Sequence, residues 1–200
     1  GDVDIGKMAP GRRTATVPAA AGVKDVCCDR ATVLGNPFEM LDDKGRHDER
    51  LRVPVVEAYT WVLRVLERDG RCESATIRRI AREGADGRGW LVSGTSRYVG
   101  LRVVEEVLER DPTGERRWEG ICKLGERVAW GESVRLLCHC RWKRGAGIGC
   151  RRCHAEPTAA HVEVEARKRA PRQEAREEVA AGGDGGEASG EGAGEESGRG

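Results

Sequence analysis

The chain has 200 residues, of which 38% are hydrophobic and 4% aromatic, and its formal net charge is +1 at pH 7. This length allows one ordinary domain with tails. No run of residues approaches the roughly 18–20 apolar positions that a membrane-spanning helix requires, so the composition argues against a membrane partner.

Charge and composition divide the chain into a body and two tails. Residues 173–200 hold eight acidic and two basic residues, so this segment carries a net charge of −6 and the rest of the chain +7. A segment rich in Gly and Glu buries too little apolar surface to offset its ordering entropy. We therefore predict a flexible leader over 1–22, one domain over 23–165, and a disordered acidic tail over 166–200.

Strand-like and helix-like segments alternate along the predicted domain. Such alternation predicts an α/β fold, with a small, mostly parallel sheet flanked by helices and disordered termini. In chain order, we expect a strand at 25–28, a turn at 34–38, helices over 53–68 and 74–83, a strand at 90–92, a helix over 101–110, a strand at 134–137 and a helix over 153–165.

Residues 90–100 form a predicted strand and a Gly-containing loop, and the helix predicted over 101–110 follows them. A helix N-terminus behind such a loop can hold a phosphate group. The segment contains neither a G-x-G-x-x-G motif nor a Walker loop. An ordinary turn between a strand and a helix is the alternative.

Four of the eight cysteines and two of the four histidines lie between Cys138 and His154. The spacing is C-x-C, nine residues, then C-x-x-C-H. Tetrahedral zinc sites accept four Cys or mixed Cys and His ligands, and short Cys pairs bind one metal from a tight turn. The candidate zinc ligands are therefore Cys138, Cys140, Cys150 and Cys153.

A reactive thiol is the second interpretation of this cluster. Cys153 stands at the start of the last predicted helix, where the helix dipole and two neighbouring arginines favour a thiolate. His154 or His139 then serves as acid or base, which makes Cys153 and His154 candidate catalytic residues. The alternative is that the cysteines pack in the core and His154 makes only local hydrogen bonds.

Basic residues surround the cysteines, with Trp142 among them. A cationic loop with an aromatic side chain can hold single-stranded nucleic acid through phosphate contacts and stacking. The alternative is a solvated loop. The basic residues are Arg141, Lys143, Arg144, Arg151 and Arg152.

Several short motifs occur together in the order of a known family. The LGNPF turn at 34–38, the Tyr59-Thr60-Trp61 segment, the C-x-C at 138–140 and the Cys-His-Ala at 153–155 resemble the family catalogued as domain of unknown function 4326. The resemblance covers 23–66 and 134–162, and the part of the chain at about 69–131 looks like an enlarged middle. The loop that contains Cys150 is longer than is usual in that family.

The resemblance implies that six residues converge in one site. In that site Arg30 would bind a phosphate or carboxylate, and Asn36 would bind a carbonyl or a base edge. The alternatives are a surface salt bridge for Arg30 and turn geometry for Asn36. Asp29 stands where the family commonly has Gly. The six residues are Arg30, Asn36, Cys138, Cys140, Cys153 and His154.

Two functions follow as hypotheses. In the first, the domain binds or acts on a small phosphate-bearing or nucleotide-like ligand, and catalysis itself is left open. In the second, it is a zinc-stabilised module that binds nucleic acid or protein. Clustered cysteines without a signal-peptide-like run favour reduced thiols, and therefore a cytoplasmic or nuclear location.

Overall fold

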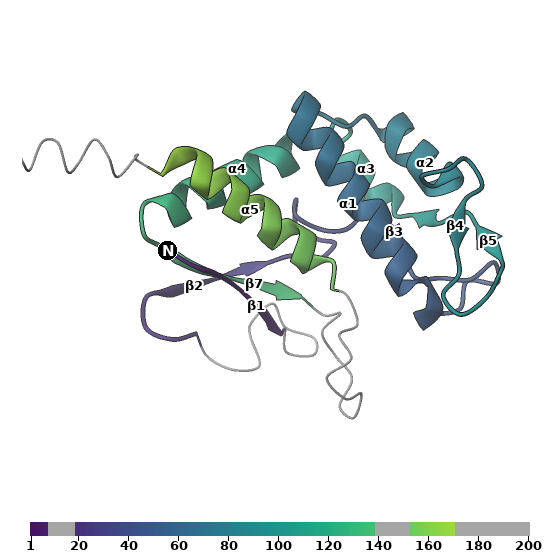
Figure 1. Cartoon of the computed structure of the whole chain (residues 1–200), viewed down its shortest axis with the longest axis horizontal. Helices are drawn as coiled ribbons and strands as arrows, with labels where there is room; N and C mark the ends of the chain where they lie inside the picture. The colour runs from purple at the N-terminus through teal and green to yellow at the C-terminus, as the bar shows by residue number, and fades with distance from the viewer. Residues whose placement is uncertain (8–18, 139–152, 171–200) are drawn as a thin grey trace, which may run out of the picture. The chain divides into compact units, whose positions relative to one another are not determined.

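Three short parallel strands form the sheet on which the candidate site is built (Figure 1). They are β1 (Val3–Lys7), β2 (Val23–Cys27) and β7 (Ser133–Cys138), in the order β1-β7-β2. β7 is the last strand in the sequence and pairs in parallel with both of the others. The sheet confirms the predicted α/β class with a small parallel sheet.

The computed structural model describes residues 1–7, 19–138 and 153–170. The predicted disorder beyond residue 170, and half of the predicted leader, therefore lie outside the described residues. Among the helices in the described part, none is both long and apolar enough to cross a membrane.

The prediction of a flexible leader over 1–22 is wrong for its first residues, because they form β1. The main chain of β1 pairs with β7 over its whole length. Val3 and Ile5 also pack against the hydrophobic core. A strand of five residues with alternating polar positions gives too short a pattern to be recognised in the sequence.

Some of the observed helices were predicted from the sequence and others were not. α1, α2 and α5 confirm predicted helices, but α5 continues beyond residue 165, so the predicted tail is wrong for residues 166–169. α4 was not predicted. The helices are the 3-10 helix η1 (Glu49–Leu51), α1 (Arg52–Asp69), α2 (Ser74–Glu83), α3 (Glu105–Arg110), α4 (Glu115–Ala129) and α5 (Ala155–Arg169).

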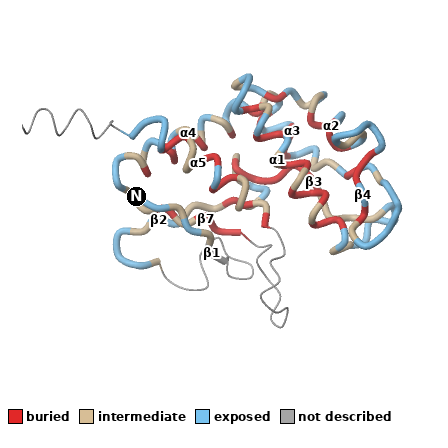
Figure 2. Tube along the Cα trace, in the orientation of Figure 1, coloured by how far each residue is buried: buried red, intermediate tan, exposed pale blue. Residues whose placement is uncertain are grey.

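Helices α4 and α5 lie together over one face of the sheet, and α1 runs beside α5 (Figure 1). Val62, Leu63 and Leu66 of α1 are fully buried, as is Leu136 of β7. Buried segments follow α1, the inner face of α5 and β7 (Figure 2). One hydrophobic core therefore joins the three helices to the sheet.

The middle of the chain forms two short antiparallel ladders. β3 (Phe38–Glu39) pairs with β6 (Arg102–Val103), and β4 (Trp90–Leu91) pairs with β5 (Tyr98–Val99). The loop between β4 and β5 therefore closes a hairpin. The prediction of a phosphate-binding loop over 90–100 is wrong, because the loop that contains Gly94 leads into the strand β5 and not into a helix.

Candidate thiol–imidazole site

Two cysteines stand side by side where β2 and β7 end. Cys27 pairs in register with Leu137, so Cys28 and Cys138 follow on neighbouring strands. The Cys28 N–H donates to the Leu137 carbonyl at 2.9 Å. Both thiols are fully buried. Because open α/β sheets bind ligands outside the carboxyl ends of their strands, these thiols mark the candidate site.

His154 immediately precedes α5 and contacts both strand ends. Its Nε2 lies 2.8 Å from the Cys28 carbonyl oxygen. Since a carbonyl oxygen only accepts hydrogen bonds, Nε2 donates, and Nδ1 of the neutral ring carries no proton.

The thiol of Cys138 lies against the same imidazole. Its Sγ is 3.4 Å from Nδ1 and 3.5 Å from Nε2 of His154. Hydrogen bonds to imidazole nitrogens run in the plane of the ring. The nearly equal distances therefore place the sulfur over the ring, in van der Waals contact but not in line with either nitrogen.

Tyr59 packs against the imidazole of His154 from α1. The two rings meet edge to face, with centroids 6.2 Å apart and an interplanar angle of 79°. The Tyr59 hydroxyl donates to the Leu34 carbonyl at 3.0 Å and accepts from Thr158 Oγ1 at 3.4 Å. Burial raises the pKa of Tyr59, so the phenol is neutral at physiological pH. The imidazole is thus held between the strand ends and α1.

Cys153 lies one residue before His154 and is 1% exposed. Its Sγ accepts a hydrogen bond from the Ala155 N–H at 3.4 Å, a contact that favours a thiolate. The sequence singled out Cys153 as the reactive thiol, whereas the structure shows the thiol of Cys138 in contact with the imidazole. Reactivity of Cys153 remains a prediction.

Arg30 and Asn36, the predicted ligand-binding residues, both hold the main chain of Phe38. Asn36 Oδ1 accepts from the Phe38 N–H at 2.9 Å, and Arg30 Nη2 donates to the Phe38 carbonyl at 3.1 Å. Arg30 Nη1 also pairs with Glu39 Oε1 at 3.1 Å. These contacts are the turn geometry and the salt bridge that the sequence left open, so a ligand-binding role for either residue remains a prediction.

The zinc and nucleic-acid predictions depend largely on residues 139–152, which lie outside the described residues. Among the described residues, no group of three or more His, Cys, Asp or Glu side chains is arranged to hold a metal ion. Cys138 and Cys153 stand at the two ends of the undescribed segment. The candidate residues outside the described part are Cys140, Cys150, Arg141, Lys143, Arg144, Arg151 and Arg152.

Three residues of the site were missed by sequence reasoning. Tyr59 was interpreted as an apolar position of a helix and as part of a family-like motif but not as a member of the site, although a buried tyrosine hydroxyl usually finds a partner. Cys28 was interpreted as part of a buried strand, and Thr158 was not considered. No short-range signal marks Cys28 or Thr158, because their contacts join segments far apart in the chain.

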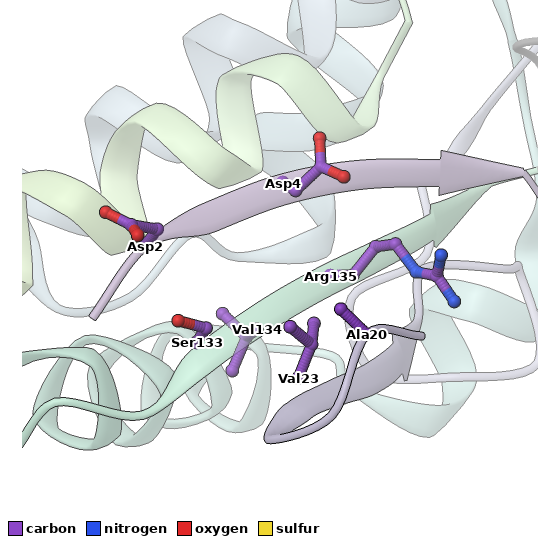
Figure 3. A pocket seen from close by; sticks show the side chains of 7 residues that line it. All are labelled: Asp2, Asp4, Ala20, Val23, Ser133, Val134 and Arg135. Carbon is purple, nitrogen blue, oxygen red and sulfur yellow. The ribbon is translucent and has the colours of Figure 1, made fainter. Parts of the chain in front are cut away.

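A cavity of about 360 Å³ lies elsewhere, along the amino-terminal halves of the strands (Figure 3). Arg135 of β7 contributes to it and pairs with Asp25 at 2.8 Å. Ser133 and Val23 begin their strands, so the cavity and the Cys138–His154 pair stand at opposite ends of the sheet. The cavity is lined by Asp2, Asp4, Ala20, Val23, Ser133, Val134 and Arg135.

The resemblance to a known family rests on short motifs, and the structure explains two of their residues. Asn36 shapes the turn at 34–38, and His154 joins the ends of β2 and β7. Comparison of the chain with family models, with curated proteins and with solved structures gives no match.

Proposed function

We propose that the domain binds a small phosphate-bearing or nucleotide-like ligand at the carboxyl edge of the sheet and presents to it a Cys138 thiol activated by His154. The observation that carries the proposal is the convergence of two strand ends on one imidazole. The Cys28 carbonyl orients His154, and Cys138 Sγ lies against the same ring. A thiol beside an oriented base is the usual arrangement of a cysteine nucleophile.

The proposed activation is a proton transfer from Cys138 Sγ to Nδ1 of His154. The product is a thiolate and an imidazolium, whose second proton stays on Nε2 beside the Cys28 carbonyl. Because the sulfur lies over the ring, the thiol must turn toward Nδ1 before the proton moves. Catalytic hydrogen bonds are often long or poorly aligned in ligand-free sites, so the observed position of the sulfur is compatible with this proton transfer.

Charge and position support the ligand class. The chain outside the acidic residues 173–200 carries a net charge of +7, which favours an anionic ligand. Arg30 lies in the loop that follows β2, and its side chain is 47% exposed. A cytoplasmic or nuclear location belongs to the same proposal, because the clustering of the cysteines along the chain favours reduced thiols.

The first test is the rate at which iodoacetamide alkylates each cysteine. In this reaction the thiolate forms an S–C bond and iodide leaves, while the thiol proton remains on His154. At about pH 6, we expect Cys138 to react about tenfold or more faster than Cys72, a thiol that is equally buried, because a positioned base supplies at least that factor. Burial raises the pKa of Cys72 to about 11, so Cys72 is a slow internal reference. Peptide mapping by mass spectrometry measures each site separately.

A matched pair of histidine variants controls this test. His154→Asn retains a donor for the Cys28 carbonyl but removes the base, so Cys138 alkylation should slow to the rate of the equally buried Cys72. His161→Asn makes the same change farther along α5, where His161 bonds to the Pro157 carbonyl, and should leave the Cys138 rate unchanged. A Cys138 rate that is slow in the unaltered protein, or equal in both variants, contradicts the activation.

Ligand binding is tested separately, by the protection of Cys138 from alkylation. A mononucleotide bound beside Cys138 should slow the alkylation of that residue and leave the rate at Cys122, on α4, unchanged. A panel of mononucleotides and of the matching nucleosides separates phosphate from base recognition. Equal alkylation rates at Cys138 with and without every member of the panel would remove the nucleotide-like ligand from the proposal.

The second candidate is a zinc-stabilised module that binds nucleic acid or protein, with Cys138, Cys140, Cys150 and Cys153 as ligands. One observation favours it. Metal-binding histidines commonly donate their other ring N–H to a carbonyl, as His154 does to Cys28. His154 would then take the place of one of these cysteines, since a tetrahedral zinc site holds four ligands. Zinc analysis of the purified, reduced protein should give about one equivalent in this case, and less than about half an equivalent rejects it.

A further inference from the structure

Arg117 is a fully buried arginine whose guanidinium is only partly satisfied. It lies in the first turn of α4 and has the largest volume among the fully buried side chains. Its Nε donates to the Val33 carbonyl at 3.1 Å. Its Nη1 and Nη2 are buried without a hydrogen-bond partner among the described residues. Two terminal NH₂ groups of a cation are therefore available to a binding partner.

A buried cation without an anion is costly, since the protein interior solvates charge poorly. The titratable neighbours Tyr59 and Cys72 provide no negative charge, because burial raises the pKa of both. Asp111 is the buried acid at this end of α4, and its two oxygens accept the main-chain N–H groups of Arg116 and Arg117. The two terminal nitrogens of Arg117, called the Arg117 fork below, therefore lack an anionic partner. An oxyanion would supply both the negative charge and the missing hydrogen-bond acceptors.

The position of Arg117 connects it to the proposed site. Arg117 binds the Val33 carbonyl, and Tyr59 binds the next carbonyl, that of Leu34. Tyr59 in turn packs edge to face on His154. Arg117 and His154 are therefore both linked to Tyr59, Arg117 through the adjacent carbonyls of Val33 and Leu34, and His154 through its ring.

We propose that the Arg117 fork is the oxyanion-binding group of this domain and takes the phosphoryl or carboxylate group of the ligand. The proposal deepens the proposed function and rests on it for the link between the anion and Cys138. Arg117 is fully buried, so an anion reaches its terminal nitrogens only if the surrounding chain moves; Val33, whose carbonyl Arg117 binds, is half-buried, and Ala31 is exposed. Bidentate pairing with both terminal nitrogens would replace the missing hydrogen bonds of Arg117.

The test compares thermal unfolding of three proteins in inorganic phosphate at fixed ionic strength. We expect phosphate at about ten times its Kd to raise the Tm of the unaltered protein by about 4 °C. Arg117→Met removes the fork but keeps an apolar chain, so it should lose this rise. Arg78→Met removes the same charge from an exposed residue that pairs with Glu105, and it should keep the rise. Without phosphate, Arg117→Met should have a Tm no lower than that of the unaltered protein, because it removes an unpaired buried charge.

Two further experiments identify the anion and test the proposal without relying on the folding of a variant. Sulfate and acetate in place of phosphate separate a tetrahedral oxyanion from a carboxylate. Nitrogen-15 NMR of the unaltered protein should show the Arg117 side-chain resonances shifting with phosphate, and this readout needs no variant. The proposal is overturned by unshifted Arg117 resonances, or by a phosphate response that is as large in Arg117→Met as in Arg78→Met.

Failure of this proposal and failure of the proposed function are distinguishable. Rapid alkylation of Cys138 together with a phosphate response that is independent of Arg117 refutes only the role of Arg117. Slow alkylation of Cys138 together with an Arg117-dependent response refutes the activated thiol and leaves Arg117 as an anion site.

Discussion

Replacement of Gly35 by alanine is expected to lower the free energy of unfolding by about 3 kcal/mol, at the upper end of the usual cost of overpacking. A Cβ on Gly35 would lie 2.5 Å from the Asp29 carbonyl oxygen and 2.7 Å from the Arg30 Cα. Both atoms belong to the main chain, so the loop after β2 must move as a whole. Chemical denaturation of Gly35→Ala against the unaltered protein measures the loss.

Gly100→Ala is the control for Gly35→Ala. A Cβ on Gly100 would meet the main chain no closer than 3.8 Å, at the Arg82 Cα, which is ordinary van der Waals contact. It should therefore change the free energy of unfolding by less than about 1 kcal/mol. If Gly35→Ala proves as mild as Gly100→Ala, the loop and the turn do not pack as described here.

Gly125→Ala is expected to destabilise the protein by about 2–3 kcal/mol, because α4 and α5 pack closely at this residue. A Cβ on Gly125 would lie 2.6 Å from the Glu165 Cβ and 3.0 Å from the Ala166 nitrogen. Neither atom can move without shifting α5. Since His154 immediately precedes α5, the substitution should also disturb the candidate site. Denaturation midpoints and the alkylation rate of Cys138 measure the two effects.

Gly120→Ala provides a matched control in the same helix. A Cβ on Gly120 would meet only side-chain methyl groups, the nearest being the Leu34 Cδ2 at 3.4 Å. Alanine is the better helix former, so Gly120→Ala should be neutral or stabilising by up to about 1 kcal/mol. Equal effects at Gly120 and Gly125 would contradict the packing of α4 on α5.

The helices that could be predicted are those whose apolar residues recur regularly. α1 is the clearest case, since Val62, Leu63 and Leu66 share its buried face. α4 could not be predicted in the same way. Gly120 and Gly125 resemble helix breakers in the sequence, although the approach of α5 makes glycine necessary at Gly125. Tertiary packing, which the sequence does not display, therefore explains why a helix forms at α4 despite these glycines.

The candidate site could be predicted in part. Cys138 and His154 stood out because thiols and an imidazole gather where a strand ends and a helix begins. Tyr59 and Arg117 did not stand out, because the carbonyls that they bind lie 25 and 84 residues away in the sequence. Asn36 also stood out, but the sequence left open whether it binds a ligand or shapes the turn. The structure shows the turn contact. The type of a residue identifies it as a candidate, but its role depends on long-range contacts that the sequence does not display.

The central claim is that the Cys28 carbonyl orients His154 so that its Nδ1 can take the proton of Cys138. Nitrogen-15 NMR of the imidazole at neutral to mildly basic pH, where the ring is uncharged, tests this claim most directly. The tautomer of His154 should carry its proton on Nε2, with Nδ1 unprotonated. A His154 ring protonated on Nδ1, or an equal mixture of both tautomers, would contradict the orientation on which the proposed thiol activation depends.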